Sequence, residues 1–286
     1  MAGTTLMPAA FVGHGSPMNA LQRNRYTSSW AELGAALPVP RAILMISAHW
    51  YIHATAVTAM PRPRTIHDFF GFPQELFDLS YPAPGAPELA AEVAEIVKPT
   101  WVGADVDSWG IDHGTWSVLA HMFPAADVPV VQLAINAMKP LEYHVELGAA
   151  LAPLRERGVL VLGSGNVVHN LAGMDPAHRD DGFDWARRFD DAARGLMLDD
   201  PGRLGALTDS PDWDAAVPTP DHFLPLAYLA GLGAAAGTGT GVLVDGCQYG
   251  SLSMTSYTLG IAPPPARSDA SGPAVATDPA PQDQNI

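Results

Sequence analysis

The sequence predicts an α/β fold in a single domain, with a central mixed, mostly parallel sheet flanked by helices. Short, continuous apolar runs of the kind found in strands buried on both faces alternate along the chain with longer helical patterns. The chain has 286 residues, which suffices for one large core, and no linker interrupts the alternation. Ligands of such sheets bind beyond the carboxyl ends of the strands, so we expect the site there.

The apolar runs and the helical patterns give the expected elements in order. Strands are expected at residues 8–12, 41–47, 54–59, 128–135, 159–162 and 241–244, with a last extended stretch at 253–259. Helices are expected at residues 30–36, 87–97, 115–122, 140–157, 183–198 and 220–231.

The C-terminal residues differ in composition from the rest of the chain. Residues 262–286 are rich in proline and alanine and contain no aromatic residue. Such a segment has too little apolar bulk to offset the entropy lost on ordering. We therefore expect one folded domain over residues 1–261 and a disordered tail over residues 262–286.

Composition and charge exclude several classes of protein. The chain carries a net charge of −15, and twelve Asp face five Arg between residues 175 and 221. Such a surface repels nucleic acid and anionic membranes, so we expect neither as a partner; it is a solvated acidic face or an acidic docking patch. No apolar run reaches the length of a membrane span, and the N-terminus lacks a secretory signal, so we expect a cytoplasmic location.

A single cysteine limits the chemistry of any metal site. Cys247 has no partner for an internal disulfide and excludes a Cys-rich zinc site. Any metal must therefore be held by His, Asp or Glu.

Three histidines follow predicted strands. His14 comes directly after the first strand, in "FVGHGSP", and His49 follows the second, in "ILMISAHW". His169 lies past the end of the strand at 159–162, in "GSGNVVHN". Since the carboxyl ends of parallel strands share one edge, these imidazoles are expected on the same rim, as metal ligands on neighbouring loops are.

Two further histidines accompany predicted helices. His222, in "PTPDHF", is expected in the first turn of a helix that Thr219 caps, with Asp221 on another side of that turn. His113, in "GIDHGTW", precedes a helix. A single histidine of this kind is more often a hydrogen-bonded loop residue than a ligand. Five at matching topological positions predict a metal site.

Other chemistry has less support. The sequence contains no G-x-G-x-x-G fingerprint after a strand, no Walker loop, no G-x-S-x-G elbow and no H-E-x-x-H pair. Ser16 and Ser164 have histidines near them in sequence, which leaves a hydrolytic triad as a minor alternative. His121 and His144 fall inside helical patterns and are expected to be structural or exposed.

Several motifs together resemble a known family. The segments "GHGSPMNAL", "AILMISAHW", "TIHDFFGFP", "GIDHGTW", "GSGNVVHNL", "TPDHFLPLAY" and "YGSLSMTSY" are similar, in order and spacing, to motifs of the 4,5-DOPA extradiol dioxygenase family. That family is part of the class III extradiol ring-cleaving dioxygenases. The resemblance extends over residues 11–259 and implies that the domain at 1–261 is catalytic.

The resemblance implies a role for each of the five histidines. It makes His14, His49 and His222 the metal ligands and His169 the acid/base, close enough to the metal to serve as an additional ligand. It places His113, as a second catalytic residue, near the substrate and oxygen. Three neutral ligands resemble both an iron site with open positions for substrate and O2 and the three-histidine zinc site of hydrating enzymes, so either Fe(II) or Zn(II) is expected, one ion per chain.

The resemblance implies a catechol, DOPA-like, and O2 as the small-molecule partners. His67, Phe69 and Trp50 are the candidate substrate-binding residues. The aromatic residues near the rim suit either a wall for a planar ring or core packing. Arg62 and Arg64 are near in sequence and would suit a substrate carboxylate, although surface solvation is their more common role.

Two alternative functions remain open from the sequence. One is a zinc-dependent hydrolase that uses the same three-histidine site. The other is a non-enzymatic protein of this fold that binds an anionic partner. The presence of both His113 and His169 favours catalysis, because an anion pocket does not need a positioned base.

Overall fold

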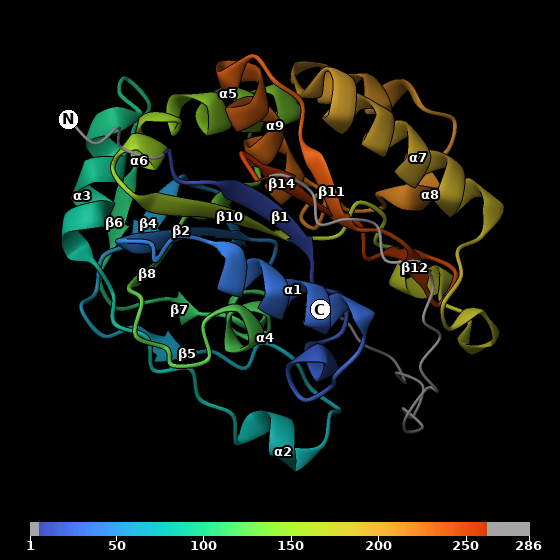
Figure 1. The fold of residues 1–286 in the computed structure, drawn as a ribbon, viewed down its shortest axis with the longest axis horizontal. Coiled ribbons are helices and arrows are strands. Elements are labelled where there is room, and N and C mark those ends of the chain that lie inside the picture. Colours follow the sequence, from blue (N-terminus) through green and yellow to red (C-terminus); the bar gives the residue numbers. More distant parts are fainter. Residues whose placement is uncertain (1–5, 262–286) are drawn as a thin grey trace.

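The computed structural model describes residues 6–261 as one α/β domain in which helices cover both faces of a central mixed sheet (Figure 1). The predicted fold class is therefore confirmed. The predicted tail at 262–286 lies outside the described residues.

The central sheet has six strands in the order β11-β14-β1-β10-β2-β8. The four strands from β1 to β8 in this order are parallel, and β14 is antiparallel to both of its neighbours. Every residue of β1, β2 and β10 is buried, which explains their continuous apolar runs. The strands of this sheet are β1 Ala9–Gly13, β2 Ala42–Ser47, β8 Val130–Gln132, β10 Val159–Gly165, β11 Gly241–Val244 and β14 Ser256–Leu259.

The helices form one layer on each face of the sheet (Figure 1). One layer contains α1 Arg25–Ala36 and α4 His113–Met122, and packs on Val12, Ile43 and Met45. The other layer packs on Phe11, Leu44 and Ile46. It contains α3 Pro87–Ile96, α5 Leu141–Ala150, α6 Pro153–Glu156, α7 Asp184–Asp199 and α9 Leu224–Ala236.

Short elements connect the layers and pair outside the central sheet. The two-stranded pairs are β3 Tyr51–Ile52 with β9 Ile135–Asn136, β4 Ala56–Thr58 with β6 Gly103–Asp105, β5 Arg64–Thr65 with β7 Gly110–Ile111, and β12 Cys247–Gln248 with β13 Leu252–Ser253. The short helices are α2 Gln74–Phe77 and α8 Trp213–Ala216, with 3₁₀ turns at η1 Pro17–Ala20, η2 Leu171–Gly173, η3 Pro176–His178 and η4 Pro201–Asp209.

Three predicted strands differ from the observed ones. The strand expected at 54–59 is β4, which pairs with β6 and not with the central sheet. The run at 128–135 is two strands, β8 and β9, and only β8 joins the central sheet. The stretch at 253–259 divides between β13 and β14. The strand at 54–59 was therefore predicted, although an apolar run does not identify its pairing partner. The two divided runs were predicted as single strands because the apolar pattern continues across the breaks.

Three predicted helices also differ. The helix expected at 30–36 begins at Arg25, after the N-cap Asn24. The helix expected at 140–157 is divided into α5 and α6 at Pro153, which has no N–H to continue the α5 ladder. The helix expected at 220–231 begins at Leu224, so Thr219 is not its N-cap and His222 lies in the turn before it.

Helices α5 and α9 pack closely because glycines lie at their contact. Ten residues of α9, from Leu224 to Gly233, are buried, so this helix is apolar on all sides. A Cβ atom at Gly148 of α5 would stand 2.3 Å from the Tyr228 carbonyl oxygen of α9. The atoms nearest to such a Cβ are backbone atoms of Tyr228, so no flexible side chain could move to make room for it.

Gly148→Ala is expected to lower the free energy of unfolding by about 1–3 kcal/mol, since it overpacks the α5–α9 contact. Gly195→Ala is the matched control, because this helical glycine of α7 has no heavy atom within 4 Å of an added Cβ. The control should gain about 0.5–1 kcal/mol from helix propensity. Urea unfolding followed by circular dichroism measures both, and equal stability of the two variants would contradict the close packing.

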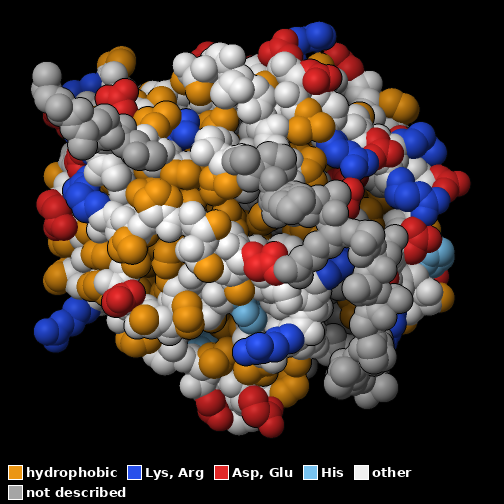
Figure 2. Space-filling view, in the orientation of Figure 1, with side chains coloured by type: hydrophobic (Ala, Val, Ile, Leu, Met, Phe, Trp, Pro, Cys, Tyr) orange, Lys and Arg blue, Asp and Glu red, His pale blue; other side chains and the backbone are white. Residues whose placement is uncertain are grey.

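The acidic segment carries many of its arginines in ion pairs. Figure 2 shows red and blue side chains intermixed where α7 lies in Figure 1. Arg187 pairs with Asp181 at 2.6 Å, and Arg188 pairs with Asp212 at 2.7 Å. This arrangement supports a solvated face over a docking patch. Within residues 6–261, no helix is both long and apolar enough to cross a membrane.

Candidate metal centre

Strands β1, β10 and β2 lie side by side and deliver three of the predicted histidines to one edge of the sheet. His14 directly follows β1, and its backbone N–H donates to the carbonyl of Gly165 at the end of β10, 3.0 Å away. His49 lies two residues after β2, and His169 lies four residues after β10. The carboxyl edge predicted from the sequence is where these side chains lie.

His14 is buried, and its tautomer follows from the hydrogen bonds of Ser164. The Ser164 hydroxyl donates to the carbonyl of Gly114 at 2.6 Å, so its oxygen accepts the hydrogen bond from His14 Nδ1 at 2.8 Å. With the proton on Nδ1, the lone pair of His14 is on Nε2. Burial, with the charges of His222, His113 and His169, holds the pKa of His14 well below its usual value, so this imidazole is neutral.

His49 faces His14 through the same nitrogen. Their Nε2 atoms lie 3.1 Å apart, and the ring of His49 is almost completely buried. Burial lowers the pKa of His49 well below its usual value, as do the charges of His113 and His222. Two neutral imidazoles that direct Nε2 at a common point are a donor set suited to a transition metal.

His222 lies in the turn before α9, and Asp221 orients it. Asp221 Oδ2 accepts a hydrogen bond from His222 Nδ1, so Asp221 does not point to another side of the turn as we expected. Burial raises the pKa of Asp221, but the hydrogen bond and charge of His222 outweigh it, and the net pKa lies below its usual value. The carboxylate therefore fixes the proton of His222 on Nδ1, as carboxylates do for metal-binding histidines.

The main chain brings His222 to the sheet. The His222 carbonyl accepts a hydrogen bond from the N–H of Asn166 at 2.9 Å. A Cβ atom at Gly165 would stand 2.1 Å from that carbonyl oxygen, so only glycine permits the contact at the end of β10.

The rings of His14, His49 and His222 form a nearly equilateral triangle. Their centres are 5.1 Å apart for His14 and His49, 5.3 Å for His14 and His222, and 5.0 Å for His49 and His222. Two imidazoles bound to one ion at about 2.0–2.1 Å have ring centres roughly 5 Å apart. The rings of the predicted ligand set are thus spaced as in such a site, and the assignment of His222 as the third ligand stays a prediction.

His113 lies beside this triangle as the first residue of α4. Among residues 6–261, the histidines whose ligand nitrogens all lie within 4.8 Å of one another are His14, His49 and His113. The ring of His113 is only 3.8 Å from that of His49 and 5.8 Å from that of His14, which is less regular than the triangle with His222. Its Nε2 is buried and has no hydrogen-bond partner among residues 6–261.

Asp68 is a functional candidate that our sequence analysis missed. Its Oδ1 accepts hydrogen bonds from the His113 backbone N–H at 3.0 Å and from His113 Nδ1 at 2.9 Å. Its Oδ2 lies 3.2 Å from His49 Nδ1. Burial raises the pKa of Asp68, but the charge of His113 and its hydrogen bonds lower it by more. The net pKa of Asp68 therefore lies below its usual value. The feature of the sequence that could have identified Asp68 is its position in the motif "TIHDFFGFP".

His169 stacks on His222 with ring centres 3.5 Å apart and planes 1° from parallel. Burial and the charge of His222 hold the pKa of His169 well below its usual value, even though Asp221 raises it. A neutral imidazole beside the predicted ligands can accept a proton at neutral pH.

The predicted substrate-binding residues lie in different surroundings. Phe69 is buried and packs edge-on against His113, with ring centres 5.4 Å apart. His67 Nε2 donates to the carbonyl of Leu79 at 2.9 Å, inside an aromatic cluster. Trp50 is buried and stacks on Trp109, with planes 3° from parallel.

Both candidate arginines are exposed. Arg62 is exposed, and Arg64 donates to the carbonyl of Ser108 at 2.7 Å, which ties its guanidinium to the loop before β7. These observations agree with a role in surface solvation.

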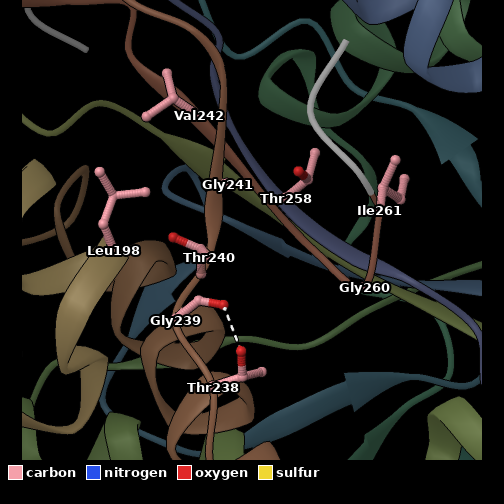
Figure 3. A pocket seen from close by; sticks show the side chains of 9 residues that line it. All are labelled: Leu198, Thr238, Gly239, Thr240, Gly241, Val242, Thr258, Gly260 and Ile261. Atoms are coloured by element: carbon pink, nitrogen blue, oxygen red, sulfur yellow. Dashed lines mark hydrogen bonds between the residues drawn. The ribbon is translucent and has the colours of Figure 1, made fainter. Parts of the chain in front are cut away.

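A cavity of about 640 Å³ lies at the opposite edge of the sheet (Figure 3). Its lining combines the loop before β11 with the end of β14, which pairs with the start of β1. The lining residues are Leu198, Thr238, Gly239, Thr240, Gly241, Val242, Thr258, Gly260 and Ile261, none of which is ionisable. The cavity is therefore separate from the histidine cluster.

The fold and the buried histidine cluster are those of an α/β enzyme with a candidate metal site, and comparisons with known proteins identify its family. The family described as "Catalytic LigB subunit of aromatic ring-opening dioxygenase" matches residues 9–260. A relative from Escherichia coli K12, named 4,5-DOPA dioxygenase extradiol, is 46% identical over 90% of this chain and 96% of its own. A relative of the same name from Beta vulgaris is 36% identical over 86% of this chain and 96% of its own.

A solved structure is also similar. The crystal structure of an uncharacterized protein from Escherichia coli K12 matches with a TM-score of 0.77 and 40% identity, over 88% of this chain and 99% of that chain. The chain belongs to the family of catalytic LigB subunits of aromatic ring-opening dioxygenases.

Proposed function

We propose that the protein opens the ring of a DOPA-like catechol beside its two hydroxyls and inserts both atoms of O2, using one divalent ion held by His14, His49 and His222. The nearly equilateral triangle of their buried rings is the observation that carries this assignment. The names of the relatives support the substrate class.

Iron(II) is the metal that we propose for activity. The ion supplies Lewis acidity that lowers the pKa of a catechol hydroxyl and, as iron, the redox chemistry that O2 requires. Zinc has no redox chemistry and would support the fold or a hydrolysis only. The carboxylates of Asp68 and Asp221, which hold imidazoles by Nδ1, offset part of the positive charge.

His169 is the proposed acid/base. Its ring is neutral because of burial and the charge of His222, so it can take a proton from a catechol hydroxyl and return it to the developing oxygen leaving group. Its stacking on His222 places it directly beside a proposed ligand, and this arrangement supports a role in proton transfer.

His113 is the proposed substrate-orienting group. In the neutral tautomer that donates from Nδ1 to Asp68, Nε2 is an acceptor, and this nitrogen is buried with no partner in the part of the chain that the structure describes. We infer that it accepts a hydrogen bond from a substrate hydroxyl. Phe69 packs edge-on against His113 and is the proposed wall for the substrate ring.

Iron-loaded protein is expected to consume O2 and form a yellow ring-opened product from at least one catechol. The test is anaerobic loading with Fe(II), addition of O2 and a panel of catechols with and without a carboxylate, followed by an oxygen electrode and absorbance. Protein loaded with Zn(II) is the matched control and should consume no O2.

The opposite outcome would support the alternatives. No oxygen uptake with any catechol, together with ester or amide hydrolysis by the zinc form, would replace the proposal with the hydrolase. Inactivity of both forms would favour the binding protein. Neither alternative has a specific observation in its favour.

A further inference from the structure

One carboxylate contacts two imidazoles of the cluster. Asp68 lies in the loop after β5. Its carboxylate oxygens face different rings: Oδ1 faces His113, and Oδ2 faces His49. The Asp68 side chain is 17% exposed, and the two imidazoles are 1% and 3% exposed. The contact is therefore largely shielded from water. In such surroundings a hydrogen bond to a charged group is stronger than it is in water.

The contact determines which nitrogen of each ring is free. Asp68 Oδ1 accepts a hydrogen bond from His113 Nδ1 at 2.9 Å. Asp68 Oδ2 lies 3.2 Å from His49 Nδ1 and so favours the His49 tautomer that carries its proton on Nδ1. Both rings then present the lone pair of Nε2. That atom of His49 lies 3.1 Å from His14 Nε2, and that of His113 is buried without a partner.

The other two proposed ligands are held separately. His14 donates to Ser164, and His222 donates to Asp221. Asp68 differs because its two partners have different proposed roles: His49 holds the metal and His113 orients the substrate. A change at this carboxylate would therefore affect both.

We propose that Asp68 is a positioning residue that fixes the tautomer and orientation of His49 and His113 together, and so joins metal retention to turnover. This inference rests on the proposed function for the role of His113, but its effect on His49 is measurable without any reaction.

Asp68→Asn tests the proposal with almost no change in shape. An amide offers one oxygen acceptor and one NH2 donor in place of two acceptors. The His113 backbone N–H and Nδ1–H both require an acceptor at Oδ1, so the amide oxygen is expected to face His113 and the NH2 to face His49. His49 must then accept at Nδ1 and carry its proton on Nε2, which removes the lone pair for the metal.

The expected result is a dissociation constant for Zn(II) or Co(II) raised about 10- to 100-fold, measured by competition with a chromophoric chelator. With Fe(II) at saturation, kcat should still fall about tenfold or more, with a smaller change in KM, because any rearranged amide leaves one imidazole in the wrong tautomer. Asp107→Asn, an exposed aspartate before β7, is the matched control and should bind metal like the wild type.

Asp68→Glu keeps both acceptors and should recover part of the metal affinity. It also serves as the second variant if Asp68→Asn fails to fold, which thermal unfolding of the metal-free protein would reveal. Metal affinity and kcat of Asp68→Asn within twofold of the wild type would overturn the proposal. Lower kcat with unchanged metal affinity would also overturn it, because His49 would not depend on Asp68.

The metal measurement separates this proposal from the proposed function. If wild-type protein opens no catechol ring, the proposed function fails, while the dissociation constants of Asp68→Asn and Asp68→Glu still decide whether Asp68 positions His49.

Discussion

His14→Ala is expected to abolish metal binding and ring-opening activity. The imidazole of His14 supplies a neutral Nε2 lone pair 3.1 Å from that of His49, and alanine supplies none. Removal of one of three proposed ligands leaves too few donors to hold the ion, so we expect less than about a tenth of an equivalent of metal per chain and a fall in kcat of at least about 10³-fold. Metal analysis after gel filtration and an oxygen electrode measure the two effects.

The neighbouring histidines provide the control for this prediction. His222→Ala should lose metal as His14→Ala does, whereas His113→Ala removes an equally buried imidazole and should retain metal while turning over slowly. If His113→Ala loses metal and His222→Ala keeps it, the third ligand is His113, whose nitrogen lies within 4.8 Å of those of His14 and His49.

His169→Ala is expected to keep its metal and to lose about 10²- to 10⁴-fold in kcat, the usual contribution of a positioned acid/base. Burial and the charge of His222 hold the pKa of His169 well below its usual value, so wild-type activity should show no loss from protonation of this residue between about pH 7 and 8. Steady-state kinetics and metal analysis provide the test. His178→Ala, at a partly exposed histidine in the same part of the chain, is the control and should leave kcat unchanged. Unchanged turnover in His169→Ala would remove this residue from proton transfer.

Residues with a strong local signal were predicted well. The strands that bear His14 and His49 are buried on both faces, so their apolar runs were readable, and the residues after them had to lie at one edge. Pro153 shows the opposite case: its signal was present in the sequence, but the helical pattern around it was interpreted as continuous.

Contacts that depend on tertiary structure were not predicted. The hydrogen bond of Asp68 to His113 joins residues 45 positions apart, and no local pattern encodes it. The contact of Asp221 with its neighbour was mispredicted because it depends on where α9 begins, and that helix starts at Leu224, after the turn. Helix ends are set by packing as much as by capping residues.

The close approach of Gly165 to the His222 carbonyl has an evolutionary consequence. Main-chain contacts bring the third proposed ligand to the sheet, and these contacts do not depend on the aromatic residues around the cluster. Phe69 packs against the ring of His113, so a change at Phe69 acts on that imidazole and leaves the main-chain contact of His222 in place. On this scaffold the aromatic surroundings of the cluster can change in evolution while the main chain still holds His222 at the sheet.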